Sequence, residues 1–369
     1  MRRHITIDAR MLESSGIGTY LRNLLENLAA IENEYAFKVI CRGRQLLQGL
    51  PPDRFRFVLA KSPIYSLSEQ WEIARLARNA PVLHSPHYNA PLLYRGNLVV
   101  TIHDLTHITD PTFKRTLAAR FYARPTFKLV ARRADRIIAN SEFTKQQIVV
   151  QLGISPSKVI VAYLGVNDHF CPHDRKQAVP RVSTLLGLKQ PYILFVGNLK
   201  PHKNVKTLIR AFAQISVHGD LDHGLVILGD DRKWKSGLVR ECEKLGIPDR
   251  VSFVPQVSYE DLPWVYGAAE MLVMPSFIEG FGLPVLEAMA CGAPVVCSRV
   301  ASLPEVAGDA AEYFDPSSVD DLAAAMERVL RSSQLQETMR LKGLERAKLF
   351  SWEECARRHC CLYEEALSA

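Results

Sequence analysis

Short apolar runs alternate with amphipathic stretches along the whole chain. In the first half, the apolar runs that predict strands cover residues 5–7, 37–40, 56–59, 82–84, 98–101 and 136–139. A second series covers residues 192–196, 225–228, 251–254, 271–273 and 294–296. Stretches of helical character separate these runs, the first from about residue 18 to residue 30. Such alternation predicts parallel sheets with helices on both faces.

A polar, proline-flanked stretch at residues 172–180 separates the two series and predicts a linker. We therefore expect an α/β protein with two Rossmann-like, doubly wound domains, residues 1–172 and 173–351. The last stretch begins with a capping-type Ser351 and has apolar residues at helical spacing, so we assign a helix at 352–369 to the first domain. Ligands of open parallel sheets bind beyond the carboxyl ends of the strands. The predicted site is therefore a cleft between the two domains.

Composition supports a globular protein and narrows its class. The chain has 369 residues, which is more than one ordinary core contains. Of these residues 47% are hydrophobic and 23% are charged, as in globular proteins. No apolar run approaches the ~18 residues of a membrane helix, and the N-terminus is too polar for a signal peptide. The eight cysteines are scattered without a CxxC pair, so neither a zinc knuckle nor a disulfide framework is predicted. A reducing cytoplasm fits this pattern best.

The net charge of +7 is concentrated in residues 113–136. The basic residues of this segment, set against one acid, Asp135, are Lys114, Arg115, Arg120, Arg124, Lys128, Arg132, Arg133 and Arg136. Such a face is either a solvated helix surface or a contact for an anionic partner, most simply a phospholipid headgroup or a lipid-linked phosphate. The second alternative predicts a peripheral protein on the inner face of the plasma membrane. A nucleic-acid partner is not expected, because no aromatic stacking platform accompanies the charge.

The most informative motif is residues 279–287, in which Glu279 and Glu287 lie eight positions apart. The apolar run before it predicts a buried strand, and Pro284 suits the start of a helix because it has no N–H group. The pattern places Glu279 in the connecting loop and Glu287 in the first helical turn. The helix dipole and the N–H groups of the loop form a seat for a phosphate. These N–H groups belong to Gly280, Phe281, Gly282 and Leu283.

Two carboxylates beside such a seat can accept hydrogen bonds from the hydroxyls of a sugar and a ribose. That chemistry is typical of a nucleotide-sugar site, although two acids at this spacing can also cap a helix. Ser276, just before the loop, is expected to add a hydroxyl group.

Asn198, Lys200 and Lys203 lie in the loop that follows the first strand of the second series. Cations in this loop can neutralise a diphosphate leaving group without a metal ion. For Lys200, an exposed lysine without a ligand is an equal alternative. No metal ion or other cofactor is predicted. The acidic pair Asp220 and Asp222 is rejected as a metal site, because it precedes a strand and so lies at the edge opposite to the expected site.

Two further loops belong to the first series. Gly16 and Gly18 open its first helix, where glycine lets backbone N–H groups approach a phosphate or a substrate; a plain tight loop is as good an interpretation. His103 closes a strand, where it can bond a sugar hydroxyl or orient a backbone carbonyl. His84 and His87 are equally well explained as ligands or as structural residues.

Together these motifs resemble the retaining glycosyltransferases of family 4, which have the GT-B fold, over nearly the whole chain. The resemblance implies that Glu287 holds the ribose hydroxyls and that Glu279 contacts the transferred sugar. It also implies that Lys203 binds the diphosphate and that His103 contacts the sugar near its reacting end. The two glycines of the first loop would close over the phosphates or the acceptor.

One position departs from the family pattern. Many members have an arginine directly after the glycine of the phosphate loop, where this chain has Asn198. Half of the usual cationic clamp is therefore missing from its usual place, and Lys200 is the candidate replacement. The loop nevertheless resembles that of bacterial mannosyltransferases of polysaccharide assembly.

The resemblance implies transfer of a hexose, with GDP-mannose favoured as donor, to a lipid-linked or oligosaccharide acceptor in cell-surface polysaccharide synthesis. No side chain is an obvious covalent nucleophile, so we expect front-face attack in which the departing phosphate oxygen takes the proton of the acceptor. The alternatives are a UDP-sugar-dependent family-4 transferase and a non-catalytic GT-B scaffold or binding protein. A nucleotide-sugar epimerase is disfavoured, because that class lacks the double-glutamate loop.

Overall fold

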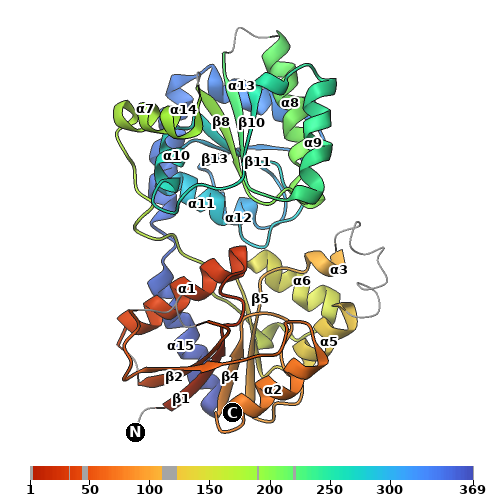
Figure 1. Ribbon diagram of the computed structural model, residues 1–369, viewed down its shortest axis with the longest axis vertical. Helices are drawn as coiled ribbons and strands as arrows, with labels where there is room; N and C mark the ends of the chain where they lie inside the picture. Colours follow the sequence, from red (N-terminus) through yellow and green to blue (C-terminus); the bar gives the residue numbers. More distant parts are fainter. Residues whose placement is uncertain are drawn as a thin grey trace. The chain divides into compact units, whose positions relative to one another are not determined.

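The chain forms two compact units in a computed structural model that describes residues 3–32, 34–43, 49–109, 123–188, 191–218 and 222–368. The first unit comprises Met1–Gly165 and Ser351–Ala369, and the second comprises Val166–Phe350 (Figure 1). The first stretch of this unit therefore ends at Gly165, whereas the sequence pattern suggested a boundary at residue 172. No described helix is long and apolar enough to cross a membrane.

The first unit contains a parallel sheet with the strand order β3-β2-β1-β4-β5-β6-β7. Its strands are β1 (Arg3–Asp8), β2 (Tyr35–Cys41), β3 (Phe55–Leu59), β4 (Val82–Ser85), β5 (Asn97–Ile102), β6 (Arg136–Ala139) and β7 (Val159–Val161). Its helices are α1 (Ser15–Ala30), α2 (Leu67–Ala77), α3 (Thr106–Thr109), α5 (Arg124–Arg133), α6 (Glu142–Leu152) and α15 (Trp352–Ser368), with the 3-10 turn η3 (Pro156–Lys158).

The second unit contains a parallel sheet with the order β10-β9-β8-β11-β12-β13. Its strands are β8 (Tyr192–Val196), β9 (Gly224–Leu228), β10 (Val251–Val254), β11 (Met271–Met274), β12 (Val295–Ser298) and β13 (Ala311–Phe314). Its helices are α7 (Arg175–Leu186), α8 (Val205–His218), α9 (Arg232–Lys244), α10 (Leu262–Ala268), α11 (Leu283–Ala290), α12 (Leu303–Ala307), α13 (Val319–Leu330) and α14 (Ser333–Ala347), with the 3-10 turns η4 (Pro201–Lys203) and η5 (Pro248–Arg250).

Both sheets confirm the predicted α/β, Rossmann-like fold class. Every residue of the central strands β4, β9, β11 and β12 is buried, which explains their uninterrupted apolar runs. In each sheet the strand order reverses beside the strand that comes first in the chain. Such a switch point opens a crevice at the carboxyl ends of the two strands that flank it.

The expected linker is wrong in one respect. Residues 175–180 of the stretch 172–180 form the first half of α7, with Pro180 inside the helix. Asp174 caps α7, because its side chain accepts a hydrogen bond from the N–H group of Lys176. A capping residue followed by a helix-compatible sequence was therefore mistaken for a loop.

The terminal helix α15 belongs to the first unit, where it packs against α1, β4 and β5. In Figure 1 it is the blue helix among the red and orange elements. Its buried stripe includes Trp352, Cys355, His359 and Tyr363. The chain thus returns to its first unit after completing the second.

Candidate functional site

The predicted site residues of the second unit gather at the switch point of its sheet. Lys203 follows β8 and Glu279 follows β11, and these two strands are neighbours. Because neighbouring parallel strands end at the same edge, residues far apart in sequence meet there. The side chains of Lys203 and Glu279 are 76 residues apart in the chain and form an ion pair.

Glycine is required where the loops after β8 and β9 meet. Gly229 has φ +150°, and a Cβ atom there would collide with the carbonyl oxygen of Gly197. Gly197 in turn has φ +154° and donates its N–H group to Leu228. The two loops therefore approach each other by their backbones, which only glycine permits at this position.

Asn198 has a local structural role. Its side-chain oxygen accepts the N–H group of Lys200 at 3.3 Å, which is an Asx-type turn that leads into η4. The Nζ atom of Lys200 has no partner among the described residues, so Lys200 remains available to a ligand. The neutral residue at the arginine position thus shapes the loop, and the cation stands two positions later.

Asn204 fixes the position of Lys203. It is buried in the left-handed conformation with φ +57°. Its Nδ2 atom donates to the carbonyl oxygens of Pro275 at 3.0 Å and Pro316 at 2.8 Å. The N–H group of Phe277 also donates to the carbonyl oxygen of His202. These bonds tie the loop after β8 to the loop after β11.

The carboxylate of Glu279 accepts two short hydrogen bonds on the same oxygen. Lys203 Nζ lies 2.7 Å and Ser276 Oγ lies 2.6 Å from Oε1. The side chains of Lys203 and Glu279 are only 15% and 9% exposed. The ammonium group is thereby held at the carboxyl edge of the sheet, where a second anion can share it.

Two serines that sequence reasoning missed hold this loop. Ser302 Oγ lies 3.0 Å from the carbonyl oxygen of Glu279 and 2.9 Å from that of Phe281. Ser298 Oγ donates to the carbonyl oxygen of Ser276 at 2.6 Å. Both serines are fully buried. A serine in a buried strand or loop gives no functional signal in a sequence, because its role depends on which carbonyl groups the fold brings within hydrogen-bond distance.

The N-terminus of α11 is open. Gly282 is its N-cap residue with φ +104°, and a Cβ atom there would lie 2.8 Å from Leu303 Cδ2. Among the described residues the N–H groups of Gly282 and Leu283 have no acceptor, and Pro284 has no N–H group. The side chain of Phe281 is buried against Phe350, so this residue can offer only backbone groups. Donors without partners at a helix start favour an anion.

Glu287 lies one turn later than the sequence predicted. It is the fifth residue of α11, in the second turn, because the helix begins at Leu283. Its Oε2 atom accepts the hydroxyl group of Tyr266 at 2.8 Å. Burial raises the pKa of Glu287 to about 7, against the lowering effect of the Tyr266 hydrogen bond. This carboxyl group therefore titrates near neutral pH.

His103 follows β5 in the first unit. Its Nε2–H group donates to the carbonyl oxygen of Pro86 at 3.1 Å, and its ring meets the ring of Tyr20 edge-on at 4.8 Å. Burial lowers the pKa of His103 to about 4, despite the nearby carboxylate of Asp104. The imidazole is therefore neutral at pH 7, and the Pro86 bond leaves Nδ1 as a hydrogen-bond acceptor.

His84 is a structural residue. It is fully buried, and its ring nitrogens lie 2.8 Å from Tyr363 Oη and 2.8 Å from Thr101 Oγ1. Both of its hydrogen-bonding positions are thus used within the first unit. His87 accepts the N–H group of Asn89, and burial lowers the pKa of His87 to about 3.

The two predicted glycines of the first unit differ in surroundings. Both lie in the first turn of α1 rather than in a loop before it. Gly18 packs on the carbonyl group of Leu12, with which any Cβ atom would collide, whereas nothing crowds Gly16. Packing alone explains the glycine at 18, and a ligand role for either residue stays a prediction.

The basic segment 113–136 is only partly available to a partner. Lys114, Arg115 and Arg120 lie outside the described residues. Arg133 donates to the carbonyl oxygens of Tyr94 and Gly96, and Arg136 pairs with Glu365 of α15. The guanidinium groups of these two arginines are therefore already engaged within the fold, and binding of an anionic partner by this segment stays a prediction.

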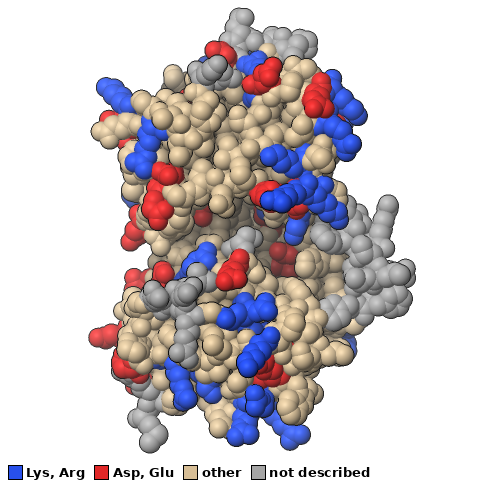
Figure 2. All heavy atoms as spheres, in the orientation of Figure 1, with Lys and Arg blue, Asp and Glu red and all other residues tan. Residues whose placement is uncertain are grey.

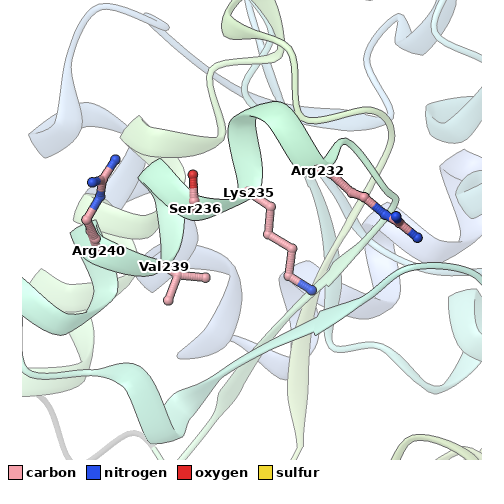
Figure 3. A pocket seen from close by; sticks show the side chains of 5 residues that line it. All are labelled: Arg232, Lys235, Ser236, Val239 and Arg240. Carbon is pink, nitrogen blue, oxygen red and sulfur yellow. The ribbon is translucent and has the colours of Figure 1, made fainter.

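A separate hollow of about 430 Å³ lies beside α9. Arg232, Lys235, Ser236, Val239 and Arg240 line it (Figure 3). It contains none of the residues predicted from the sequence. Within the described part of the chain, no group of three His, Cys, Asp or Glu side chains could hold a metal ion; Asp220 of the rejected acidic pair lies outside that part.

Both halves of the chain match families of known proteins. Residues 14–170 match the family described as Glycosyltransferase Family 4, and residues 179–346 match Glycosyl transferases group 1. An O-antigen chain mannosyltransferase B of Escherichia coli is 30% identical over 367 residues, 92% of this chain and 93% of the relative. A D-inositol 3-phosphate glycosyltransferase of Mycobacterium sp. (strain KMS) is 35% identical over 244 residues, 64% of this chain and 53% of the relative.

Solved structures share the fold at low sequence identity. A sucrose-phosphate synthase from Thermosynechococcus elongatus has a TM-score of 0.80 at 22% identity, with 100% of both chains covered. The Anabaena protein HepE in complex with UDP and glucose has a TM-score of 0.80 at 18% identity, covering 99% of this chain and 100% of that chain. The chain belongs to the family-4 glycosyltransferases and has the GT-B fold.

Proposed function

We propose that this glycosyltransferase moves a hexose, with mannose from GDP-mannose favoured, to a lipid-linked or oligosaccharide acceptor in cell-surface polysaccharide synthesis. The likeness to the Escherichia coli O-antigen chain mannosyltransferase, which extends over nearly all of both chains, supports this choice of sugar and pathway class. A UDP-sugar donor is the alternative, favoured by the UDP bound to a structural relative.

The observation that carries the proposal is the ion pair of Lys203 with Glu279. In the proposed complex the Lys203 ammonium group turns to the diphosphate, and the carboxylate of Glu279 accepts a hydroxyl of the transferred sugar. Ser276 keeps Glu279 in place through its 2.6 Å hydrogen bond. Lys200 adds a second cation. The N–H groups of Gly282 and Leu283 at the start of α11 contribute further donors to the departing phosphate.

Glu287 and His103 complete the proposed roles. Glu287 holds the ribose hydroxyls, and Tyr266 orients it. His103 is neutral at pH 7 and accepts a sugar hydroxyl at Nδ1, because its Nε2–H group is used by Pro86. Gly16 and Gly18 at the start of α1 close over the phosphates or the acceptor.

The proposed reaction retains the anomeric configuration and uses no metal ion. The acceptor oxygen attacks the anomeric carbon from the face that the diphosphate leaves, and the departing phosphate oxygen takes the acceptor proton. Lys203 and the α11 N–H groups supply the charge stabilisation that a metal ion would otherwise supply. Addition of EDTA should leave the rate unchanged, and NMR of the product should show the anomeric configuration of the donor.

The central test replaces Lys203 by methionine, which keeps the length of the side chain and removes its charge. We expect kcat/KM for the nucleotide-sugar to fall by about 10²–10³-fold, as for loss of one preorganised donor to a leaving group. Lys206→Met is the matched control, because Lys206 lies three residues further on, is exposed and pairs with Glu241 instead of Glu279. Equal rates for wild type and Lys203→Met would sink the proposal.

Donor identity requires turnover with a panel of GDP-, UDP- and ADP-sugars. Highest kcat/KM with GDP-mannose is the expected result, and preference for a UDP-sugar would select the alternative donor. Calorimetry with GDP, UDP and ADP separates an enzyme from a scaffold. Absence of binding for all three nucleotides would contradict an enzymatic function.

A further inference from the structure

Four apolar side chains are exposed together on the surface of the first unit. The exposed fraction is 92% for Leu67, 69% for Trp71, 57% for Leu93 and 37% for Leu92. Leu67 and Trp71 lie one turn apart on α2, so they share its outer face. We call these four residues the α2 patch. Apolar residues scattered singly are ordinary on a protein surface, but a contiguous group marks an interaction site.

Hydrogen bonds show that the two parts of the α2 patch adjoin. The side-chain amide of Gln70 donates to the carbonyl oxygen of Ala90 at 3.3 Å and accepts the N–H group of Leu92 at 2.9 Å. A turn closed by the N–H group of Tyr94 and the carbonyl oxygen of Pro91 carries Leu92 and Leu93. Gln70 immediately precedes Trp71, so the turn is held against the same stretch of α2.

The inner face of α2, opposite to the α2 patch, is anchored in the first unit. The inner face of α2 buries Glu69, Ile73 and Ala77. Glu69 is only 1% exposed and pairs with the buried Arg10 at 2.8 Å. The outward apolar side chains therefore cannot turn inward to escape water without breaking a buried ion pair. This exposure costs free energy in water, which a partner would recover.

The charges around the α2 patch are positive. Arg75 and Arg95 are exposed beside it, and neither side chain has an ion-pair partner in the described residues. The remaining acid of α2, Glu72, is occupied by the N–H groups of Lys61 and Ser62. The patch thus combines apolar side chains with a cationic border.

Helix α5 of the same unit also has a basic face. Its exposed Arg124, Lys128 and Arg132 recur every four residues, with the 53% exposed Leu129 beside them. The opposite face of α5 packs on the core that α2 also covers. Figure 1 shows α2 and α5 in orange and gold within the same unit, and Figure 2 shows mostly Lys and Arg among the charged side chains around α2.

We propose that the α2 patch inserts into the headgroup region of an anionic bilayer, while the basic face of α5 binds lipid phosphates. Tryptophan and leucine surrounded by arginine and lysine are the composition of an interfacial anchor. A second copy of the chain fits less well, because it would bring two cationic borders together. The inference goes beyond the proposed transfer reaction, since it concerns none of the donor-site residues.

The test measures partition of the full chain onto phosphatidylcholine vesicles with and without phosphatidylglycerol. Wild type should bind only the vesicles with phosphatidylglycerol, and Trp71→Ser should bind them about tenfold more weakly, as expected for loss of one large buried apolar side chain. Trp234→Ser is the control, because Trp234 is exposed in the second unit. Quenching of tryptophan fluorescence by brominated lipid should be reduced in Trp71→Ser and retained in Trp234→Ser.

Two results would overturn the inference. One is equal vesicle partition of Trp71→Ser and wild type. The other is a dimer in sedimentation that dissociates on the Trp71→Ser substitution, because the patch would then be covered by a second copy. Transfer to a water-soluble acceptor should be unchanged in Trp71→Ser, so failure of the membrane inference and failure of the proposed reaction are distinguishable.

Discussion

Acid should loosen the attachment of α15 to the first unit through His359. This histidine is fully buried, and its Nδ1–H group donates to the carbonyl oxygen of Cys355 at 2.7 Å. Its Nε2 atom must then accept the hydroxyl group of Tyr20, which lies at 2.7 Å. In the neutral form of the imidazole both ring nitrogens already make a hydrogen bond. A second proton, on Nε2, would therefore face the hydroxyl proton of Tyr20 and have no acceptor.

The same constraint fixes which group donates in each further hydrogen bond that connects to Tyr20. Because the Tyr20 hydroxyl group donates to His359, its oxygen accepts from Thr101 at 3.0 Å. Thr101 in turn accepts the Nε2–H group of His84, whose Nδ1 atom accepts the hydroxyl group of Tyr363. One directed chain of hydrogen bonds thus joins α15 at two points to α1, β4 and β5. Protonation of either histidine reverses a bond and breaks the chain.

The size of the effect follows from the two pKa values of His359. Burial lowers its pKa from 6.5 to about 4, with a smaller contribution from repulsion by His103. Between these values the unfolded chain binds a proton that the folded chain does not, so stability falls as the pH decreases and is unaffected above 6.5. At pH 5 the loss from His359 alone is about 2 kcal/mol. His84, whose ring centroid lies 5.5 Å away, adds to it because burial also lowers its pKa.

Hydrogen exchange of the α15 amides at pH 7.5 and pH 5, corrected for intrinsic exchange rates, would measure this loss. His359→Gln should be less stable than wild type at pH 7.5 but should lose about 2 kcal/mol less on acidification. His4→Gln is the control, because His4 is exposed on β1 and should leave the pH dependence unchanged. An identical acid loss in wild type and His359→Gln would refute the reasoning.

Two further predictions concern the second unit. Tyr266→Phe removes the hydrogen bond that lowers the pKa of Glu287, so this pKa should rise by roughly one unit or more above about 7. The pH profile of donor affinity should shift upward with it. An unshifted profile would show that Glu287 does not take part in donor binding. Gly229→Ala should cost about 3 kcal/mol or more in urea unfolding, because its Cβ atom meets the Gly197 carbonyl oxygen. Gly237→Ala, at an uncrowded position inside α9, should instead stabilise by about 0.5–1 kcal/mol, and the explanation fails if the two alanines behave alike.

The sequence predicted the fully buried central strands and missed two of the four edge strands. The central strands are buried on both faces and therefore appear as unbroken apolar runs. The edge strands β7, Val159–Val161, and β13, Ala311–Phe314, were missed. The edge strands β3 and β10, which are no more buried, were predicted, so burial alone is not the reason. Strand β7 is only three residues long, and Glu312 interrupts the apolar residues of β13, so neither forms an apolar run long enough to stand out.

The donor-site motifs were predictable to the level of the loop, but their contacts were not. A strand followed by a glycine-bearing turn and a proline identified the 279–287 loop. The sequence could not show that Glu279 shares one oxygen between Lys203 and Ser276, or that Ser302 anchors the loop from 23 residues away. Such contacts depend on strand order, since β8, β11 and β12 are neighbours only in space.

By itself the sequence determined the class of the protein, because alternating periodicities and loop chemistry are local properties of a chain. The two parallel sheets, the glutamate loop and the lysine loop all follow from patterns a few residues long. Only the tertiary structure decided what individual side chains do. It placed His84 in a buried network, engaged Arg133 and Arg136 with neighbours inside the first unit, and exposed Trp71. The reason is physical: burial, pairing and exposure are set by neighbours that the fold brings from distant parts of the chain.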